Sequence, residues 1–502
     1  MTLLSHFIWA LVFLMPFNSL ASRDKKDQIE GEYFVILKEK PRKPEEKIPS
    51  KEEQRKKQTL KEIVKNLGGQ VIDEYSFIFL GAHVYLKNSA VEALKNNPLV
   101  QKIIPNSRAY LNDNSTIPKS WGLDRIDQFV KKLNGRYTVF STGAGAHVYI
   151  MDTGVRATHS DFRGRVRDGF SALKDPSMPY FSPYDDCHGH GTHVAGTALG
   201  TSSGVARQAL LHPVKVFDCR GSTPFDIILK GYEWIMANHK KPAVVNMSFG
   251  SEKNEASNIA VANMIKAGIH VVIAAGNSND NACKYSPASV PEAITVAATN
   301  DNDQRVTPGF WGSNWGPCVD IFAPGLSITS ASKNSDDSFI QMSGTSMAAP
   351  HVTGAVALAL GHFPEMPPKA MENYIVSKAL SGKIGKVNGS PNKFLVVSRF
   401  SDSPFAFAGE DRFLKVPRSS YTLRGLAKDF TSGLSSSNWT QISGPEVKAS
   451  HSLEPQKWFQ SLTIYDPKEG SYIFNFEVIN QEGKKSSDQV KISLLNTNNL
   501  PP

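Results

Sequence analysis

Five short runs of almost entirely apolar residues constrain the fold of this 502-residue chain more than any other feature. Sequences with helical periodicity alternate with them between residues 114 and 400. The runs are His147–Met151, Leu211–Phe217, Ala243–Met247, His270–Ala274 and Ala293–Ala297. Strands that are apolar on both faces are typical of a parallel sheet covered by helices on both sides. We therefore predict an α/β unit over residues 114–400, with functional residues after the carboxyl ends of its strands.

Different patterns flank this unit, as expected for a chain too long to form one compact domain. Residues 22–113 follow the order βαββαβ of a ferredoxin-like unit, with strands expected at Val71–Phe79 and Val100–Pro105 among others. Residues 401–502 show no helical pattern, and short alternating runs separated by turns predict a small β-sandwich there.

The first 21 residues have the pattern of a cleaved signal peptide. An apolar run, Phe7–Met15, is followed by Pro16 and by a small-residue site that ends at Ala21. No Lys or Arg precedes the run, which departs from the usual pattern, and an anchor helix is the alternative. Because the run is short for a membrane span, we expect cleavage and a secreted protein, extracellular or periplasmic.

Composition excludes several other functions. The formal net charge of +9 is spread along the chain, without a basic stripe carrying interleaved aromatic residues, so we expect no nucleic-acid partner. No internal stretch is long and apolar enough to hold the chain in a membrane after signal cleavage, and we expect a monomer. The four cysteines allow three disulfide pairings, among which the sequence alone does not choose.

Three polar residues stand where the predicted strands end or helices begin. Asp152 follows the first apolar run, His190 lies between two glycines, and Ser346 begins an Ala- and Gly-rich helix. Each has an ordinary explanation when taken singly: a turn aspartate, a structural histidine or a helix N-cap. Together they could form a catalytic triad, in which a carboxylate orients an imidazole that takes the proton of a serine nucleophile.

A fourth polar residue, Asn277, follows the run His270–Ala274. Its amide N–H, with the backbone N–H of Ser346, could stabilise the oxyanion of a tetrahedral intermediate. The resulting chain order of Asp, His, Asn and Ser is that of subtilisin, and it differs from the order in chymotrypsin and in α/β-hydrolases.

Two other functions compete with this hypothesis. His188, His190 and His193 loosely resemble the His-x-His-x-Asp-His pattern of zinc hydrolases, but Thr192 occupies the position of the required aspartate. The chain could also be a catalytically inactive binding protein that acts through its sandwich. No member of the triad is missing, which favours the enzyme.

The motifs around these residues resemble the subtilisin-like proteases, within them the proteinase K and aqualysin branch, over residues 30 to about 400. Trp121–Asp127 resembles the start of a mature aqualysin-type enzyme, although Val194 stands where proteinase K has a free cysteine. The resemblance implies a serine endopeptidase with the disulfides Cys187–Cys219 and Cys283–Cys318. It also implies that residues 22–113 are an inhibitory propeptide, cut near Asn114, and the last unit resembles a PKD-like domain.

The resemblance further implies a cleft that binds an extended protein or peptide substrate between two strands. Phe225 would form the wall of the S4 pocket, and small residues beside Tyr285 would form an S1 pocket with a broad preference for apolar or aromatic side chains. The alternative is that Phe225 and Tyr285 are simply core aromatics. The implied substrate-binding residues are Gly221, Ser222, Thr223, Phe225, Ser248, Phe249, Gly250, Ala274, Ala275, Gly276 and Tyr285.

One structural calcium site is implied as well. Asp320 matches a ligand aspartate of the family, and the backbone oxygens of Pro291 and Ala293 match its partners. Oxygen ligands of this kind suit Ca²⁺, although an ordinary turn aspartate is the alternative.

Overall fold

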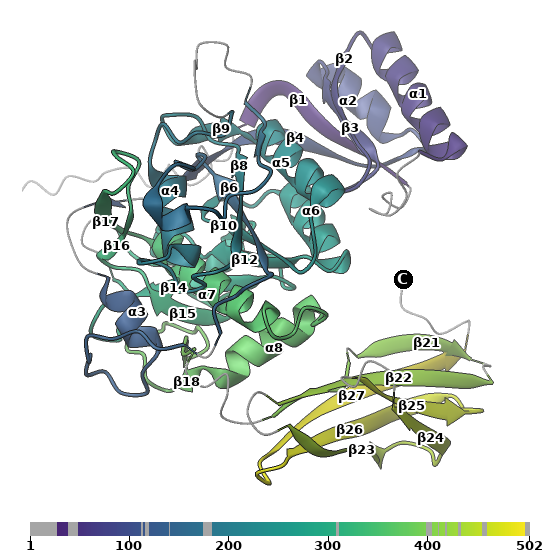
Figure 1. Cartoon of the computed structure of the whole chain (residues 1–502). Helices are drawn as coiled ribbons and strands as arrows, with labels where there is room; N and C mark the ends of the chain where they lie inside the picture. Colours follow the sequence, from purple (N-terminus) through teal and green to yellow (C-terminus); the bar gives the residue numbers. More distant parts are fainter. Residues whose placement is uncertain are drawn as a thin grey trace, which may run out of the picture.

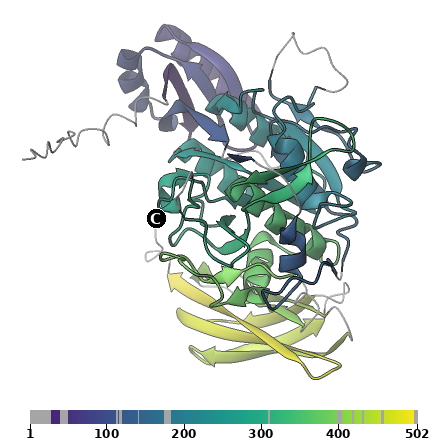
Figure 2. The same cartoon turned by 90° about the vertical axis from the view of Figure 1, so that its left-hand side faces the viewer.

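The fold is described from a computed structural model, which describes residues 28–38, 49–111, 114–115, 120–139, 141–173, 183–307, 311–397, 404–409, 411–416, 419–429, 433–453 and 459–496. The signal peptide that the sequence predicts over residues 1–21 lies outside these residues. Three parts follow one another along the chain, and Figure 2 shows the first and the last at opposite ends of the large central unit. Among the described residues, no helix has the length and apolar character needed to cross a membrane.

The N-terminal part has the predicted βαββαβ order, and its four strands pair in the order β4-β1-β3-β2. Its elements are β1 (Gln28–Leu37), α1 (Lys51–Asn66), β2 (Gln70–Tyr75), β3 (Gly81–Tyr85), α2 (Asn88–Lys95) and β4 (Val100–Leu111). One face of the sheet packs on α1 and α2 through residues such as Val35 and Val84. The other face, with Phe34 and Tyr75, shares a core with the central unit.

The central unit confirms the predicted α/β class. Its nine-stranded sheet has the order β18-β19-β15-β14-β12-β10-β6-β8-β7, and all pairs except β18–β19 are parallel. The strands are β6 (His147–Asp152), β7 (Phe170–Ser171), β8 (Leu210–Lys215), β10 (Ala243–Met247), β12 (His270–Ala274), β14 (Ile294–Thr299), β15 (Ile321–Pro324), β18 (Leu380–Ser381) and β19 (Lys393–Phe394). These strands form the centre of the molecule in Figure 1.

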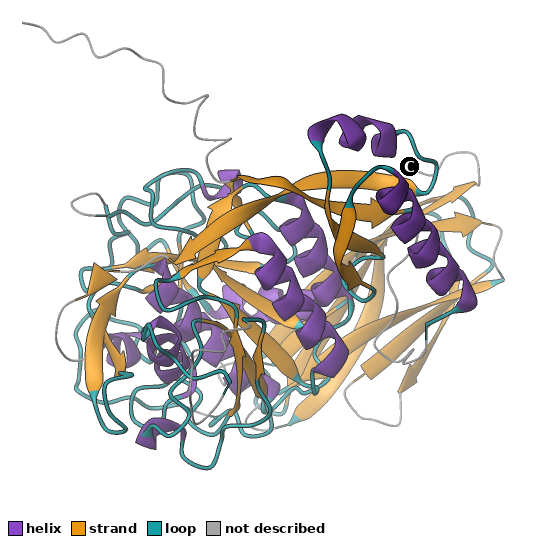
Figure 3. Cartoon of the chain, turned by 90° about the horizontal axis from the view of Figure 1, so that it is seen from above, coloured by secondary structure: helices purple, strands orange, loops and turns teal. Residues whose placement is uncertain are grey.

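Helices cover both faces of this sheet. Successive side chains of each strand point to opposite faces, and because most of them are apolar, both faces are buried under helices. Val148 and Ile150 face one layer, whereas Tyr149 and Met151 face the other. The first layer contains α4 (His190–Leu199), α7 (Thr345–Leu360) and α8 (Pro368–Lys378), and the second contains α5 (Phe225–Asn238) and α6 (Glu255–Lys266). In Figure 3, helices (purple) lie beside strands (orange). A short helix, α3 (Trp121–Ile126), precedes β6 in the chain.

The C-terminal part is the predicted β-sandwich. One sheet contains β20 (Phe405–Phe407), β22 (Ser420–Lys428), β24 (Lys448–Leu453) and β25 (Phe459–Tyr465). The other contains β21 (Arg412–Val416), β23 (Leu434–Ser443), β26 (Gly470–Asn480) and β27 (Lys485–Asn496). Trp439 and Phe476 pack between the sheets. The sandwich contacts the central unit where the Lys428 ammonium lies 4.7 Å from the centre of the Phe363 ring.

Candidate active site

The end of β6 and the start of α4 bring Asp152 and His190 together. The imidazole Nδ1 of His190 lies 2.8 Å from Oδ1 and 2.9 Å from Oδ2 of Asp152, although 38 positions separate the two residues in the chain. Both side chains are fully buried. A carboxylate can only accept here, so Nδ1–H donates, and the imidazole tautomer with its proton on Nδ1 is fixed.

Ser346 is the second residue of α7, in the helix layer that also contains α4. The two helices approach closely, since a Cβ added at Gly354 of α7 would lie 2.6 Å from the carbonyl oxygen of Ala198 in α4. The backbone of Ser346 is fixed against Ser248, because each hydroxyl donates to the other residue's carbonyl oxygen at 3.0 Å. Ser248 directly follows β10, which pairs in parallel with β6, so the first turn of α7 lies at the same edge of the sheet as Asp152.

Asn277 is held beside the serine by Thr345, the residue before it. The Thr345 backbone N–H and hydroxyl both donate to Oδ1 of Asn277 at 2.9 Å. Because Oδ1 is engaged on Thr345, the orientation of the amide is fixed and its Nδ2 donor is directed away from that residue. Thr345 was not predicted as a functional residue, since nothing in its type or position reveals its contact with Asn277.

The predicted substrate-binding segments form two short strands, β9 (Ser222–Pro224) and β11 (Phe249–Glu252). The end of β4 lies between them and pairs antiparallel with both, Ala109 with Thr223 and Tyr110 with Gly250. Farther along the chain, β5 (Asn114–Ser115) pairs with β17 (Phe339–Ser343). The chain thus enters the predicted cleft as a third strand and leaves it beside the segment that leads to Ser346.

A pocket of about 210 Å³ lies at the end of β12, next to Asn277. Its walls include Gly250 and all four of the residues predicted to line S1, which are Ala274, Ala275, Gly276 and Tyr285. Phe225, predicted to form the wall of an S4 pocket, is the first residue of α5 and is fully buried in the core that α5 shares with the N-terminal part.

Among the described residues, the three histidines of the zinc hypothesis do not bring three ligand atoms together. His190 binds Asp152 through Nδ1, whereas Nε2 of His193 lies 2.9 Å from the carbonyl oxygen of Ile328. Burial lowers the pKa of His193 to about 3, so this side chain is a neutral core residue. The geometry favours a positioned imidazole over a metal centre.

The predicted calcium ligand Asp320 is largely buried beside β14. Its Oδ2 accepts the backbone N–H of Thr295 at 2.8 Å, two residues after Ala293. Burial raises the pKa of this carboxyl to about 7. A carboxylate that is so poorly compensated, bonded to the backbone of Thr295, fits a site for a hard cation.

Another group of potential metal ligands lies between the N-terminal part and α5. Among the described residues, only Glu32, His83 and Asp226 bring three such atoms within 4.8 Å of one another. The Asn106 amide already donates to both carboxylates, and the Lys230 ammonium lies 3.5 Å from Asp226. Both carboxylates of this cluster therefore have partners without a metal ion.

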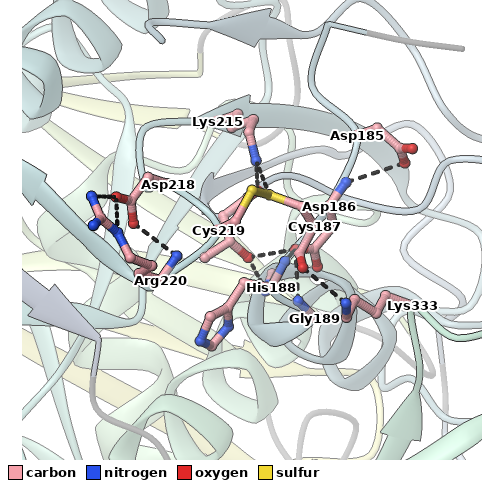
Figure 4. The surroundings of a disulfide bond; sticks show 12 residues. Asp185, Asp186, Cys187, His188, Gly189, Lys215, Asp218, Cys219, Arg220 and Lys333 are labelled. Carbon is pink, nitrogen blue, oxygen red and sulfur yellow. Dashed lines mark hydrogen bonds and ion pairs between the residues drawn. A yellow bond between two sulfur atoms is a disulfide. The ribbon is translucent and has the colours of Figure 1, made fainter. Parts of the chain in front are cut away.

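The four cysteines form the pairs that the resemblance implied, Cys187–Cys219 and Cys283–Cys318, with Cα atoms 5.0 and 5.3 Å apart. The first bond joins the segment before His190 to the segment before β9 (Figure 4).

A carboxylate, an imidazole and a hydroxyl at neighbouring element ends of an α/β sheet define the class of serine hydrolases.

Comparison with known proteins narrows this class. Residues 143–401, just over half of the chain, match the Subtilase family, and residues 408–494 match a family of PKD domains. The chain belongs to the subtilase family and is a subtilisin-like serine endopeptidase with a C-terminal PKD domain.

Individual relatives agree with this assignment. An extracellular serine proteinase of Thermus sp. (strain Rt41A) is 43% identical over 65% of this chain and 78% of its own length. An alkaline serine exoprotease A of Vibrio alginolyticus is 42% identical over 55% of this chain and 49% of its own length. The crystal structure of a cold-adapted subtilisin-like serine proteinase superposes with a TM-score of 0.52 at 39% identity, over 57% of this chain and 99% of that one.

Proposed function

We propose that the chain is the precursor of a secreted endopeptidase that cuts proteins through an acyl-enzyme on Ser346. His190 takes the Ser346 proton, the hydroxyl oxygen attacks the scissile carbonyl, and the Asn277 amide with the Ser346 backbone N–H stabilises the oxyanion. His190 then protonates the leaving amine, and water hydrolyses the acyl-enzyme. The observation that carries the proposal is the buried contact between His190 and Asp152, which prepares the imidazole as a base.

We propose apolar or aromatic side chains as the preferred P1 residues, because small residues and Tyr285 line the pocket beside Asn277. Digestion of a peptide library by the processed enzyme tests both the reaction and this preference. Cleavage at internal bonds after Phe, Tyr, Leu or Met is expected, whereas removal of terminal residues only would contradict an endopeptidase.

Residues 22–113 are proposed to be a propeptide that inhibits its own protease until it is cut near Asn114. The support is the antiparallel pairing of the end of β4 with β9 and β11, the arrangement expected of a bound substrate. Glu233 of α5 strengthens the docking, since its carboxylate accepts the backbone N–H groups of Ser76, Phe77 and Ile78.

Docking of the propeptide is expected to weaken below about pH 6.5. Burial in the interface lowers the pKa of His83 from its ordinary value of 6.5, although Asp226 and Glu32 oppose the shift. The undocked form therefore binds more protons, so acidification favours release by up to about tenfold per pH unit. Hydrogen exchange of the β4 amides at pH 5.5 and 7.5, in a full-length Ser346→Ala chain, measures this effect after correction for intrinsic rates.

The matched control is His83→Gln, which keeps a polar side chain without a proton that titrates in this range. This variant is expected to lose most of the extra exchange at pH 5.5. An equal response to pH in both chains would assign the effect to groups other than His83.

We propose that Asp320 and the backbone oxygens of Pro291 and Ala293 hold a structural Ca²⁺. Bound calcium supplies the positive charge that the buried carboxylate lacks. Without the ion, the raised pKa means that the folded state binds the Asp320 proton more tightly than the unfolded state does. Stability from this group is then present below about pH 4 and is lost as the pH rises through about 7.

Calcium is expected to raise the thermal unfolding midpoint of the processed enzyme at pH 8. At a concentration 100 times the dissociation constant, one site adds about 2.7 kcal/mol, or roughly 4 to 10 °C for a domain of this size. Calorimetry with calcium and with a chelator measures the shift, and Asp320→Asn should lose a large part of it. A variant that responds as strongly as the native enzyme would place the calcium elsewhere.

We also propose roles for the other parts of the chain. Residues 1–21 would direct export, and residues 114–400 would form the mature catalytic domain. Two disulfides are typical of proteins in an oxidising compartment, which supports export. The Thermus relative is named an extracellular proteinase, which supports the same proposal. We expect the PKD-like unit over residues 401–502 to serve binding rather than catalysis, and the enzyme to act as a monomer without nucleic-acid partners.

A further inference from the structure

The helix that carries His190 has no cap of its own. Its N-cap is Gly189, which has no side chain, and His190 is the first helical residue. The first N–H groups of any helix need acceptors from outside the helix. Residues from other segments must therefore hold the first turn of α4, and whatever holds this turn also holds the imidazole.

Asp186 supplies several acceptors at this turn, and it is 7% exposed. Its Oδ1 accepts the backbone N–H groups of His188 at 3.0 Å and Gly189 at 2.7 Å. Its Oδ2 accepts the backbone N–H of Thr192 at 2.9 Å and the Thr192 hydroxyl at 2.6 Å. Figure 4 shows this carboxylate beside Gly189, on the Cys187 side of the disulfide.

Thr153 joins this cap to the strand that carries Asp152. The Thr153 hydroxyl donates to Oδ1 of Asp186 at 2.9 Å and accepts the backbone N–H of Gly191 at 2.9 Å. Asp152 and Thr153 are neighbours in the chain, as are His190 and Gly191. The contacts between Asp152 and His190 and between Thr153 and Gly191 therefore close a small ring.

The ring leaves little room for adjustment. A Cβ added at Gly191 would lie 2.1 Å from the carbonyl oxygen of Gly154 and 3.0 Å from Cβ of Asp152. The backbone of α4 is thus pressed against the loop after β6. Burial of the Asp186 carboxylate is made tolerable by the helix N-terminus and by the nearby Lys215 ammonium, which donates to the carbonyl oxygen of Thr153.

We propose that Asp186, acting through Thr153, is a positioning residue for the reaction, an inference that rests on the proposed function. Asp186 touches neither substrate nor reacting atoms. It fixes the first turn of α4 against the end of β6, so that the His190 imidazole stays on Asp152 and can take the Ser346 proton through its second nitrogen. A misplacement of about 1 Å in such a site can lower the rate about 100-fold.

Asp186→Asn tests the proposal, because it keeps the size of the side chain but replaces one acceptor oxygen with a donor. The kcat of the processed enzyme, per active site titrated with a serine-directed inhibitor, is expected to fall about 10- to 100-fold, with KM changed less than about threefold. The acid limb of the pH–rate profile should move to lower pH, because the imidazolium is less well paired with Asp152. Loss of fold stability alone would reduce the number of active sites and leave both quantities unchanged.

The matched control is Asp185→Asn, the same change one residue earlier, where the carboxylate accepts the Asp186 backbone N–H at 3.1 Å. This variant should retain kcat within about twofold. Thr153→Val should reproduce the loss seen in Asp186→Asn, whereas Thr153→Ser, which keeps the hydroxyl, should restore activity. A general failure of the proposed function would abolish the activity of the native chain as well, which distinguishes the two failures.

A second measurement tests the position of His190 without removal of the propeptide. In the full-length Ser346→Ala chain, the His190 Nδ1–H donated to Asp152 should give a low-field proton NMR signal, and Asp186→Asn should shift or broaden it. Two results would overturn the proposal: a titrated kcat within twofold of the native value with an unmoved acid limb, or a His190 signal that is the same in both chains.

Discussion

Replacement of Ser346 by Ala is expected to lower the rate of peptide hydrolysis by about 10⁶-fold. Loss of the nucleophile lowers kcat by about 2 × 10⁶ in subtilisin, a member of the same family. The change removes one hydroxyl, which donates to the carbonyl oxygen of Ser248, so the fold should persist. The rate is measured with a chromogenic peptide after a second protease has removed the propeptide, so that an uncut propeptide cannot account for the loss.

The same variant should also remain at full precursor length, because cleavage near Asn114 requires its own nucleophile. Mass spectrometry of the purified protein reports this directly. Ser335→Ala, on an exposed turn, is the matched control and should process and hydrolyse normally. More than about 1% of native activity, or spontaneous removal of the propeptide from the Ser346→Ala chain, would be incompatible with a nucleophilic Ser346.

Replacement of Asn277 by Ala is expected to lower kcat about 10²- to 10³-fold, with KM changed only a few-fold. This loss corresponds to about 2.7–4 kcal/mol for one oxyanion donor, a magnitude measured in subtilisin. The donor acts on charge that develops only in the transition state, so its loss appears in kcat. Steady-state kinetics of the processed variant gives both quantities.

Because Asn277 also anchors Thr345, a second variant separates the two roles. Asn277→Asp keeps the acceptor for the Thr345 N–H and hydroxyl but has no N–H donor, and it should be at least as impaired as Asn277→Ala. Thr345→Ser keeps the hydroxyl and should remain active. A kcat within about fivefold of the native value in Asn277→Ala would remove Asn277 from the oxyanion hole.

The fold of the central unit could be predicted because each of its buried strands is recognisable from its own few residues. Strands such as β10 and β12 are buried on both faces, so nearly every residue in them is apolar and the pattern survives without knowledge of the partners. The polar residues that follow these strands stand out against the apolar runs, so their positions at the strand ends could be predicted as well. The pairing of His190 with Asp152 followed from placing both at one edge of a parallel sheet.

Two strand boundaries in the N-terminal part could not be predicted. The sequence predicts a strand that ends at Pro105, whereas β4 continues to Leu111 because its last residues pair with β9 and β11 across the cleft. The strand predicted over Val71–Phe79 instead ends at Tyr75. The following N–H groups bind the Glu233 carboxylate, more than 150 residues away, instead of a neighbouring strand.

The residues that hold the catalytic groups in place could not be predicted either. Asp186 lies four residues before His190 and Thr345 directly before Ser346. Their roles depend on contacts with Thr153 and Asn277 from other segments. Hydrogen bonds between remote segments leave no periodicity in a sequence. Residue type and spacing identify the groups that do chemistry, whereas the groups that hold them in place emerge only from the fold.

We expect Asp152, His190 and Ser346 to act as one catalytic unit, and covalent labelling of the processed enzyme tests this expectation. A peptidyl phosphonate with an aromatic P1 side chain reacts only with a serine that an adjacent base activates. Mass spectrometry of the digested protein should locate one phosphonate per chain, on Ser346, and His190→Ala should lose the label. A label on another serine, or equal labelling of Ser346 without the imidazole, would contradict the account.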